Sequence, residues 1–265
     1  MIKAVNKLLE PYGINAKNVI KLEGYVSTNY KITDKNRNHY VLKYYSDASE
    51  LPVIQEEIEL VNNIKDELPF QLSETLIRNG KSIHHYEDGS YFRLLTYIEG
   101  ELLGDVEHTT SLLHNFGRAT AQLDTALIHI NAPNLSSQQL HWDIQYALLN
   151  SNRIKFIKEP PRKKLVDYFL DQFEHFALPD LRTLRQQIIH NDLNDWNVLC
   201  RGDEITGFID FSDVAHSALI NELATALAYV MMNKDDPFVD AAHVIKGYIS
   251  VLPLAEKELS LLHYL

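Results

Sequence analysis

The chain has a single cysteine, no long apolar run and no excess of basic residues, and each absence excludes a class of protein. With Cys200 as its single cysteine, the chain cannot form an internal disulfide, which suits a reducing compartment. Its longest apolar run, residues 223–232, is about half as long as a membrane span must be. Lysines and a glutamate interrupt the apolar residues at the N-terminus, so no signal peptide is predicted there. We therefore predict a cytoplasmic location and no membrane partner.

Charge and apolar content describe an acidic globular chain. The net charge of −11 argues against a nucleic-acid partner, which would need a basic face, and is compatible with a cationic small molecule. The apolar fraction of 45% is ordinary for a folded protein. A length of 265 residues fits one large domain or two lobes.

The first part of the chain has the pattern of strands and hairpins with one helix. Two β-rich runs, residues 19–32 and 39–45, flank a polar turn. Residues 49–68 follow with apolar side chains at helical spacing, and Ser49 is the candidate cap. A hairpin is predicted around Asp88-Gly89, a strong turn pair. This order predicts a small mixed sheet with one helix.

After residue 99 the pattern becomes mainly helical. Helices are predicted within residues 109–127, 162–176 and 221–232, and the last is apolar enough to lie at the centre of a core. The predicted fold is α+β and two-lobed. A β-rich N-terminal lobe would span residues 1–98, and a larger, mainly α C-terminal lobe would span residues 99–265.

The last residues predict that the C-terminal lobe continues in a longer protein. Leu259, Leu262 and Leu265 form an apolar stripe that is followed by no glycine cap or polar stop. We therefore expect a truncated lobe, with further segments or domains in the full-length protein.

The stretch HNDLNDWNVL, residues 190–199, concentrates polar groups directly before a strand. Asn197 lies where one strand of a predicted hairpin begins and Asp210 where the other ends, and antiparallel pairing brings these ends together. A carboxylate and an amide oxygen at one place suit Mg2+, which completes its shell with phosphate and water. Asp192, in the preceding loop, is placed to accept a hydroxyl proton. Each residue alone is compatible with a solvated turn, whereas their spacing favours a catalytic site.

This spacing has a known counterpart. His190-x-Asp192-x4-Asn197, followed by FIDFSD at 208–213, resembles the catalytic and metal motifs of the eukaryotic-like kinase fold. IIHNDLNDWNVL is similar to the aminoglycoside phosphotransferase and choline kinase branch. YFRLLTYIEG, HWDIQYA and GFIDFSDVAHSALINELATALAYVMM most resemble hydroxylysine kinase and its bacterial relatives. The resemblance covers nearly the whole chain and implies a protein-kinase-like fold and a phosphotransferase with an alcohol group as acceptor.

The resemblance implies roles for individual residues. Asp192 would be the catalytic base, and Asn197 and Asp210 would hold Mg2+. Lys43 would pair with the α- and β-phosphates of ATP or GTP, with Glu57, or alternatively Glu56, as its acidic partner. The remaining candidates for nucleotide binding lie in a phosphate-covering loop without the G-x-G-x-x-G pattern and in the hinge, and they are Gly24, Ser27, Thr28, Asn29, Thr96 and Ile98.

Acidic residues beyond those that a metal needs predict a cationic acceptor. Asp195, Asp213 and Glu222 could hold the amine of a hydroxylysine-like molecule, an amino alcohol or an aminoglycoside through charge-assisted hydrogen bonds. Asp213 could instead join the metal or cap a helix, and Glu222, in an apolar helix, could have a buried partner. Trp196 is interpreted as a core aromatic, with a lid over the substrate as the alternative.

Other functions remain open at this stage. The acceptor could be homoserine-like or another metabolite, and a nucleotide-binding pseudokinase would share the fold. The intact set of Lys43, Asp192, Asn197 and Asp210 weighs against a pseudokinase. A protein kinase is disfavoured because the chain enters its next helix by about Asn221, which leaves no room for a long activation segment.

Overall fold

The computed structural model describes residues 2–24, 27–86 and 88–265, and the chain divides into two compact units. The first unit contains Met1–Asn62 and Leu72–Glu99, and the second contains Asn63–Gln71 and Gly100–Leu265. The expected α+β class is confirmed. The division follows Glu99, and the segment 63–71, which was expected in the N-terminal lobe, belongs to the second unit. No helix in the described parts of the chain is both long enough and apolar enough to cross a membrane.

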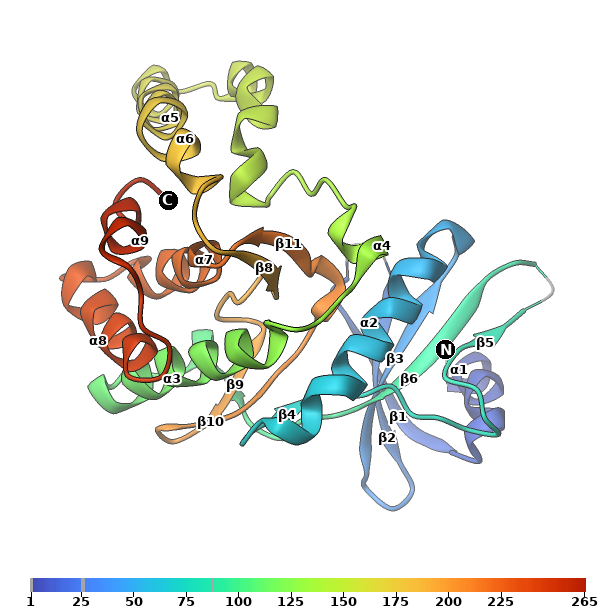
Figure 1. The fold of residues 1–265 in the computed structure, drawn as a ribbon. Coiled ribbons are helices and arrows are strands. Elements are labelled where there is room, and N and C mark those ends of the chain that lie inside the picture. The colour runs from blue at the N-terminus through green and yellow to red at the C-terminus, as the bar shows by residue number, and fades with distance from the viewer. Residues whose placement is uncertain (1, 25–26, 87) are drawn as a thin grey trace. The chain divides into compact units, whose positions relative to one another are not determined.

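A five-stranded sheet in the order β1-β2-β3-β6-β5 forms most of the first unit (Figure 1). Neighbouring strands are antiparallel, and Ile32, Leu42 and Leu94 are completely buried in the core on one face. The strands are β1 (Ala16–Leu22), β2 (Thr28–Asp34), β3 (His39–Tyr45), β5 (His84–His85) and β6 (Tyr91–Thr96).

The predicted turn at Asp88-Gly89 is present between β5 and β6. Gly89 has a φ of +85°, a conformation that glycine adopts without steric cost. Asp88 fixes the turn because its Oδ1 accepts hydrogen bonds from the backbone N–H of Ser90 at 2.9 Å and from its hydroxyl at 2.5 Å.

The first unit contains two α-helices in its described residues. Helix α1 (Ile2–Leu9), which the sequence did not predict, buries Val5 and Leu9 in the core of the sheet. Helix α2 (Leu51–Ile64) buries the apolar face expected for it. Ser49 is not its cap: Asp47 accepts the Ser49 N–H at 2.9 Å and starts a 3-10 turn, Ala48–Glu50, that leads into α2.

The second unit is mainly helical and contains two small sheets. A four-stranded sheet has the order β4-β10-β9-β7, and β11 pairs with β8. The strands are β4 (Gln71–Leu72), β7 (Glu101–Leu102), β8 (Gln186–Ile189), β9 (Val198–Arg201), β10 (Glu204–Phe208) and β11 (Ala215–Ala218). Its helices are α3 (Thr110–Leu127), α4 (Pro133–Ser136), α5 (Pro160–Gln172), α6 (Leu178–Leu181), α7 (Ile220–Met231), α8 (Pro237–Ile249) and α9 (Glu256–Leu261).

The three helices predicted in this unit are present as α3, α5 and α7. Helix α5 ends in a π-helical turn, Phe173–Ala177, whose Phe176 stacks on Tyr264 with ring centroids 5.7 Å apart. Most residues of helix α7 are buried, as its apolar sequence indicated. Cys200 is also buried, and its thiol donates to the Glu101 carbonyl at 3.5 Å.

Helices α3 and α8 lie side by side because each has a glycine at the contact (Figure 1). A Cβ atom added at Gly117 would lie 1.9 Å from the Val244 carbonyl oxygen, and one added at Gly247 would lie 1.9 Å from the His114 carbonyl oxygen. Both obstacles are backbone atoms, so a side chain at either position would force the helices apart.

We therefore expect Gly117→Ala to destabilise the protein by about 1–3 kcal/mol, the usual range for overpacking a core. In an exposed helix the same change stabilises by about 0.5–1 kcal/mol, so the sign of the effect identifies the close approach. Urea denaturation of the wild type, Gly117→Ala and Gly247→Ala measures it. A stabilising effect of both substitutions would contradict this packing.

Candidate active site

The loop between β8 and β9 carries Asp192, and its side chain is held from two sides. Asn194 Nδ2 donates to Asp192 Oδ1 at 2.8 Å, and Asn197 Nδ2 donates to Asp192 Oδ2 at 2.8 Å. Asn197 Nδ2 also donates to the Asp192 carbonyl at 2.8 Å. Burial, with the charge of Asp210 as a smaller cause, raises the pKa of Asp192 to about 6. The carboxylate is thus fixed in place and more basic than an ordinary aspartate.

Two residues of this region have a left-handed backbone. Asn191 has a φ of 67° and Asp210 a φ of 64°. Residues other than glycine adopt this conformation at a cost of about 1–3 kcal/mol, and such residues cluster at functional sites. Asn191 directly precedes Asp192, and Asp210 directly follows the end of the β9–β10 hairpin.

The open end of that hairpin brings Asn197 and Asp210 together, as predicted. Val198 pairs with Phe208, and the Ile209 N–H donates to the Asn197 carbonyl at 3.0 Å, which extends the ladder by one step. Ser212 Oγ donates to Asp210 Oδ1 at 3.0 Å. Because the amide nitrogen of Asn197 is turned toward Asp192, its Oδ1 is the atom left for a cation.

This donor set fits Mg2+. It offers one amide oxygen and one carboxylate, which are hard ligands of the type that Mg2+ prefers. No group of three or more His, Cys, Asp or Glu side chains in the described residues could hold a metal ion by itself. A cation at Asn197 and Asp210 would therefore complete its shell with water and phosphate oxygens.

His190 is a neutral brace behind the loop. It is completely buried, and burial lowers its pKa to about 4. Its Nδ1 accepts the Asp192 N–H at 3.3 Å, so Nε2 carries the proton and donates to the Ile209 carbonyl at 3.0 Å. The ring thus connects the loop of Asp192 to the segment that leads to Asp210.

Glu222 is buried, as expected if its partner is another buried group of the protein. Its side chain is completely buried, and its Oε2 accepts the backbone N–H groups of His190 and Asn191. Glu222 thus holds the backbone just before Asp192, and its assignment as a substrate residue stays a prediction.

The other residues expected near an acceptor differ in position. The side chain of Asp195 has an oxygen, Oδ1, that is buried and has no hydrogen-bond partner within the described parts of the chain. Asp213 ends the 3-10 turn Phe211–Asp213, and its carbonyl accepts Asn191 Nδ2 at 3.2 Å. Trp196 is 55% exposed, so its interpretation as a core aromatic is wrong.

Tyr229 of α7 is a neighbour that the sequence did not single out. Burial raises its pKa, and the charges of Asp192 and Asp195 raise it further. The part of the second unit around Asp192 is therefore acidic beyond the needs of a cation at Asn197.

In the first unit, the nucleotide candidates Asn29 and Lys43 lie on the same face of the sheet. Asn29 pairs with Lys43 in the β2–β3 register, and Lys43 pairs with Arg93 in the β3–β6 register, so the three side chains form a cross-strand row. Glu57 reaches this row from α2, where its Oε2 lies 2.6 Å from Arg93 Nη2. Of the two acids proposed to partner Lys43, Glu57 is the buried one and Glu56 is more exposed.

Arg93 is a further residue of this face, and the sequence contains a signal for its burial. Its side chain is 1% exposed, and it also donates to the Tyr45 hydroxyl at 3.1 Å. An arginine in the apolar strand YFRLLT must find a buried acid, because an unpaired buried charge is very costly. Burial opposes its charge, but Glu57 and Tyr45 more than offset this, and the pKa of Arg93 lies above its usual range.

The loop between β1 and β2 closes through Asn29. Asn29 Nδ2 donates to the Glu23 carbonyl at 3.1 Å, and Ser27 Oγ donates to Asn29 Oδ1 at 2.6 Å. A Cβ atom at Gly24 would lie 2.4 Å from the Ser27 carbonyl oxygen, so this position requires glycine. Thr28 begins β2, and residues 25–26 at the tip of the loop lie outside the described residues.

The two hinge candidates are not equivalent. The Thr96 N–H donates to the Glu74 carbonyl at 2.8 Å, and Thr96 Oγ1 accepts the Glu74 N–H at 2.9 Å. Thr96 can therefore offer its N–H to a nucleotide base only by breaking a bond within the sheet. Ile98, two residues later, is 3% exposed.

The sequence profile described as the phosphotransferase enzyme family matches residues 20–250. The chain belongs to this family. The predicted phosphotransferase activity is thereby confirmed, and the chain is a small-molecule kinase.

Curated relatives of this phosphotransferase include hydroxylysine kinases. The one from Danio rerio is 28% identical over 96% of this chain and 76% of its own length, and the one from Xenopus laevis is 28% identical over 99% and 78%. A homoserine kinase from Zymomonas mobilis is 28% identical over 89% of this chain and 72% of its own length.

Solved structures with the same fold confirm the kinase-like architecture. Amicoumacin kinase in complex with AMP-PNP, Ca2+ and Ami has a TM-score of 0.73 at 16% identity, covering 100% of this chain and 84% of that one. A microcompartment-associated aminopropanol kinase has a TM-score of 0.70 at 17% identity, covering 100% and 85%.

Proposed function

We propose that this phosphotransferase moves the γ-phosphoryl group of ATP or GTP to the hydroxyl of a small, amine-bearing alcohol, with Asp192 as the general base. The observation that carries the proposal is the fixed Asp192 carboxylate beside a cation site at Asn197 and Asp210. The hydroxylysine kinase relatives support an acceptor of hydroxylysine type.

The chemistry assigned to this chain is mainly positioning and charge compensation. The acceptor oxygen attacks the γ-phosphorus, the bond from that phosphorus to the β,γ-bridging oxygen breaks, and Asp192 takes the hydroxyl proton. The two amides that hold Asp192 fix its oxygens toward the acceptor. Lys43 would neutralise the α- and β-phosphates. Mg2+ bound at Asn197 and Asp210 would supply further neutralisation of phosphate charge.

The preference for an amine rests on Asp195. A buried carboxylate oxygen that lacks a partner is costly, and an ammonium group would satisfy it through a charge-assisted hydrogen bond. Asp195 lies three residues after Asp192 in the same loop, so an amine held at Asp195 would bring a hydroxyl on a neighbouring carbon toward Asp192. The amine would thus orient the reacting hydroxyl.

We expect amino alcohols to exceed matched neutral alcohols in kcat/KM by about tenfold or more, the size of one charge-assisted contact. The assay compares hydroxylysine, homoserine, short amino alcohols and aminoglycosides with their amine-free analogues, each with ATP and with GTP. Asp195→Asn should raise KM for the amines and leave KM for the neutral analogues nearly as it was. Equal turnover of amines and neutral alcohols would contradict the proposed acceptor class.

A homoserine-like acceptor is the second candidate. The homoserine kinase of Zymomonas mobilis supports it because the match covers most of both chains. Homoserine also carries an amine and a hydroxyl, so the same panel separates the two. Turnover of neither acceptor, together with retained nucleotide binding, would favour a pseudokinase instead.

A further inference from the structure

The first unit contains a cavity that the proposed chemistry does not use. Its volume is about 320 Å³, within the range of roughly 300–1,000 Å³ that is usual for small-molecule sites. The end of α1 and the 3-10 turn Glu10–Tyr12 line part of it, and the edge strand β5 with its neighbours lines the rest (Figure 1). The lining residues include Lys7, Glu10, Lys81, His84, Tyr86 and Phe92.

This cavity lies on the opposite face of the sheet from the nucleotide candidates Asn29 and Lys43. Phe92, which lines the cavity, directly precedes Arg93 in β6, and successive residues of a strand point to opposite faces. Arg93 belongs to the cross-strand row of Asn29 and Lys43, whereas Phe92 belongs to the core that also contains Val5 of α1. A ligand in the cavity would therefore be distinct from a nucleotide bound at Lys43.

Aromatic rings form a stack beside the cavity. The His84 ring stacks on Phe92 with centroids 5.3 Å apart, and Tyr12 packs edge-on against His84 at 5.0 Å. Tyr86 lies 5.5 Å from Phe92. His84 Nε2 is buried and has no hydrogen-bond partner among the residues that the structure describes. A phenylalanine would fill this place without burying an unpartnered nitrogen, so packing alone does not account for a histidine here.

The charged groups of the lining favour an anion. Lys7 and Lys81 are exposed, and within residues 2–24, 27–86 and 88–265 neither forms an ion pair. Glu10 is the one acid of the lining in this part of the chain. The lining thus has more cationic than anionic side chains, although the chain as a whole has a net charge of −11. Lysines without an acidic partner attract a carboxylate or phosphate group.

We propose that this cavity is a second ligand site, which binds a small organic anion with an apolar body. Lys7 and Lys81 would hold the anionic group, and Tyr86 and Phe92 would contact the apolar part. The proposal does not rest on the proposed function, because none of the residues assigned to phosphoryl transfer lines the cavity.

Four small probes separate the two features of this ligand. Benzoate and phenyl phosphate have an anionic group and a ring, acetate lacks the ring, and benzylamine combines the ring with a positive charge. We expect the better of the first two to bind at least about fivefold more tightly than acetate and benzylamine. Protein NMR titration of the full chain measures each Kd, and the backbone signals of His84, Tyr86 and Phe92 should move.

Substitution of the two lysines places the bound probe. Lys7→Gln and Lys81→Gln should each weaken binding of the better probe by about two- to fivefold, the usual effect of losing an exposed ion pair. Their effects should add in the double variant. Lys35→Gln, which removes an exposed cation from the same unit, is the matched control and should leave the Kd unchanged. Lys43→Gln should also leave it unchanged, because Lys43 lies on the other face of the sheet.

Three results would overturn the proposal. The first is that neither benzoate nor phenyl phosphate binds, and the second is that benzylamine binds as tightly as they do. The third is an affinity that falls in Lys43→Gln and stays at the wild-type value in Lys7→Gln and Lys81→Gln. The titrations need no turnover, so a failure of the proposed function would leave this test intact.

Discussion

We expect Asp192→Ala to lower kcat by about 100- to 10,000-fold, the usual contribution of a general base, while nucleotide binding stays nearly intact. The reason is that Asp192 and the proposed metal ligands have separate roles. Asp192 is held by Asn194 and Asn197, and its proposed target is the acceptor hydroxyl. Steady-state kinetics with the best acceptor of the panel gives kcat, and titration with a fluorescent nucleotide gives the Kd.

Two variants make this result specific. Asp210→Ala removes the carboxylate proposed to hold Mg2+, so it should weaken binding of the Mg-nucleotide itself. Asp105→Ala removes an exposed acid from the same unit and should change neither quantity. Loss of kcat and of nucleotide binding to the same extent in Asp192→Ala and Asp210→Ala would contradict separate roles for the two aspartates.

The approach of Asn197 and Asp210 in the second unit could be predicted because it is local in sequence. Asn197 and Asp210 flank a short hairpin, and antiparallel pairing alone brings them together. The buried face of α2 could also be predicted, because apolar residues at helical spacing lie on one side of a helix. In both cases few residues separate the groups that meet.

Errors arose where the environment is set by distant segments. The residues next to Trp196 in the sequence do not determine whether its side chain points into the core or toward solvent, and in the structure the ring is exposed. The cap of α2 is a different, local error: Ser49 was predicted, but Asp47, two residues earlier, accepts the backbone N–H that starts the preceding 3-10 turn.

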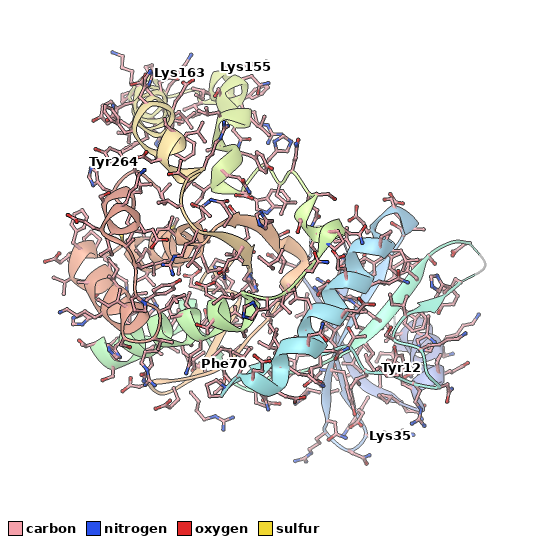
Figure 2. The ribbon with its side chains drawn as sticks, in the orientation of Figure 1. Tyr12, Lys35, Phe70, Lys155, Lys163 and Tyr264 are labelled. Atoms are coloured by element: carbon pink, nitrogen blue, oxygen red, sulfur yellow. The ribbon has the colours of Figure 1, made fainter. Side chains whose placement is uncertain are left out.

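The ion pair in the first unit should have the largest effect on stability. Arg93 and Glu57 have side-chain exposures of 1% and 5%, so removing one partner leaves the other as an uncompensated buried charge. We expect Arg93→Met to lower the free energy of unfolding by about 3–5 kcal/mol, the usual cost of breaking a buried pair. Lys35→Met, which removes an exposed cation from the turn after β2, is the matched control and should have little effect (Figure 2).

The double variant Glu57→Met/Arg93→Met separates the pair from the packing around it. Replacing both charges by apolar side chains of similar length removes the desolvation cost of each, so much of the stability lost in Arg93→Met should return. Urea denaturation of the wild type, Arg93→Met, Lys35→Met and the double variant provides the comparison. If the double variant is less stable than Arg93→Met, the guanidinium stabilises this face mainly through Tyr45 and Thr75, to which it also donates, and not through Glu57. Since Lys43 lies opposite Arg93 on β3, nucleotide affinity measured on the same four proteins shows whether the pair also orders the proposed phosphate-binding row.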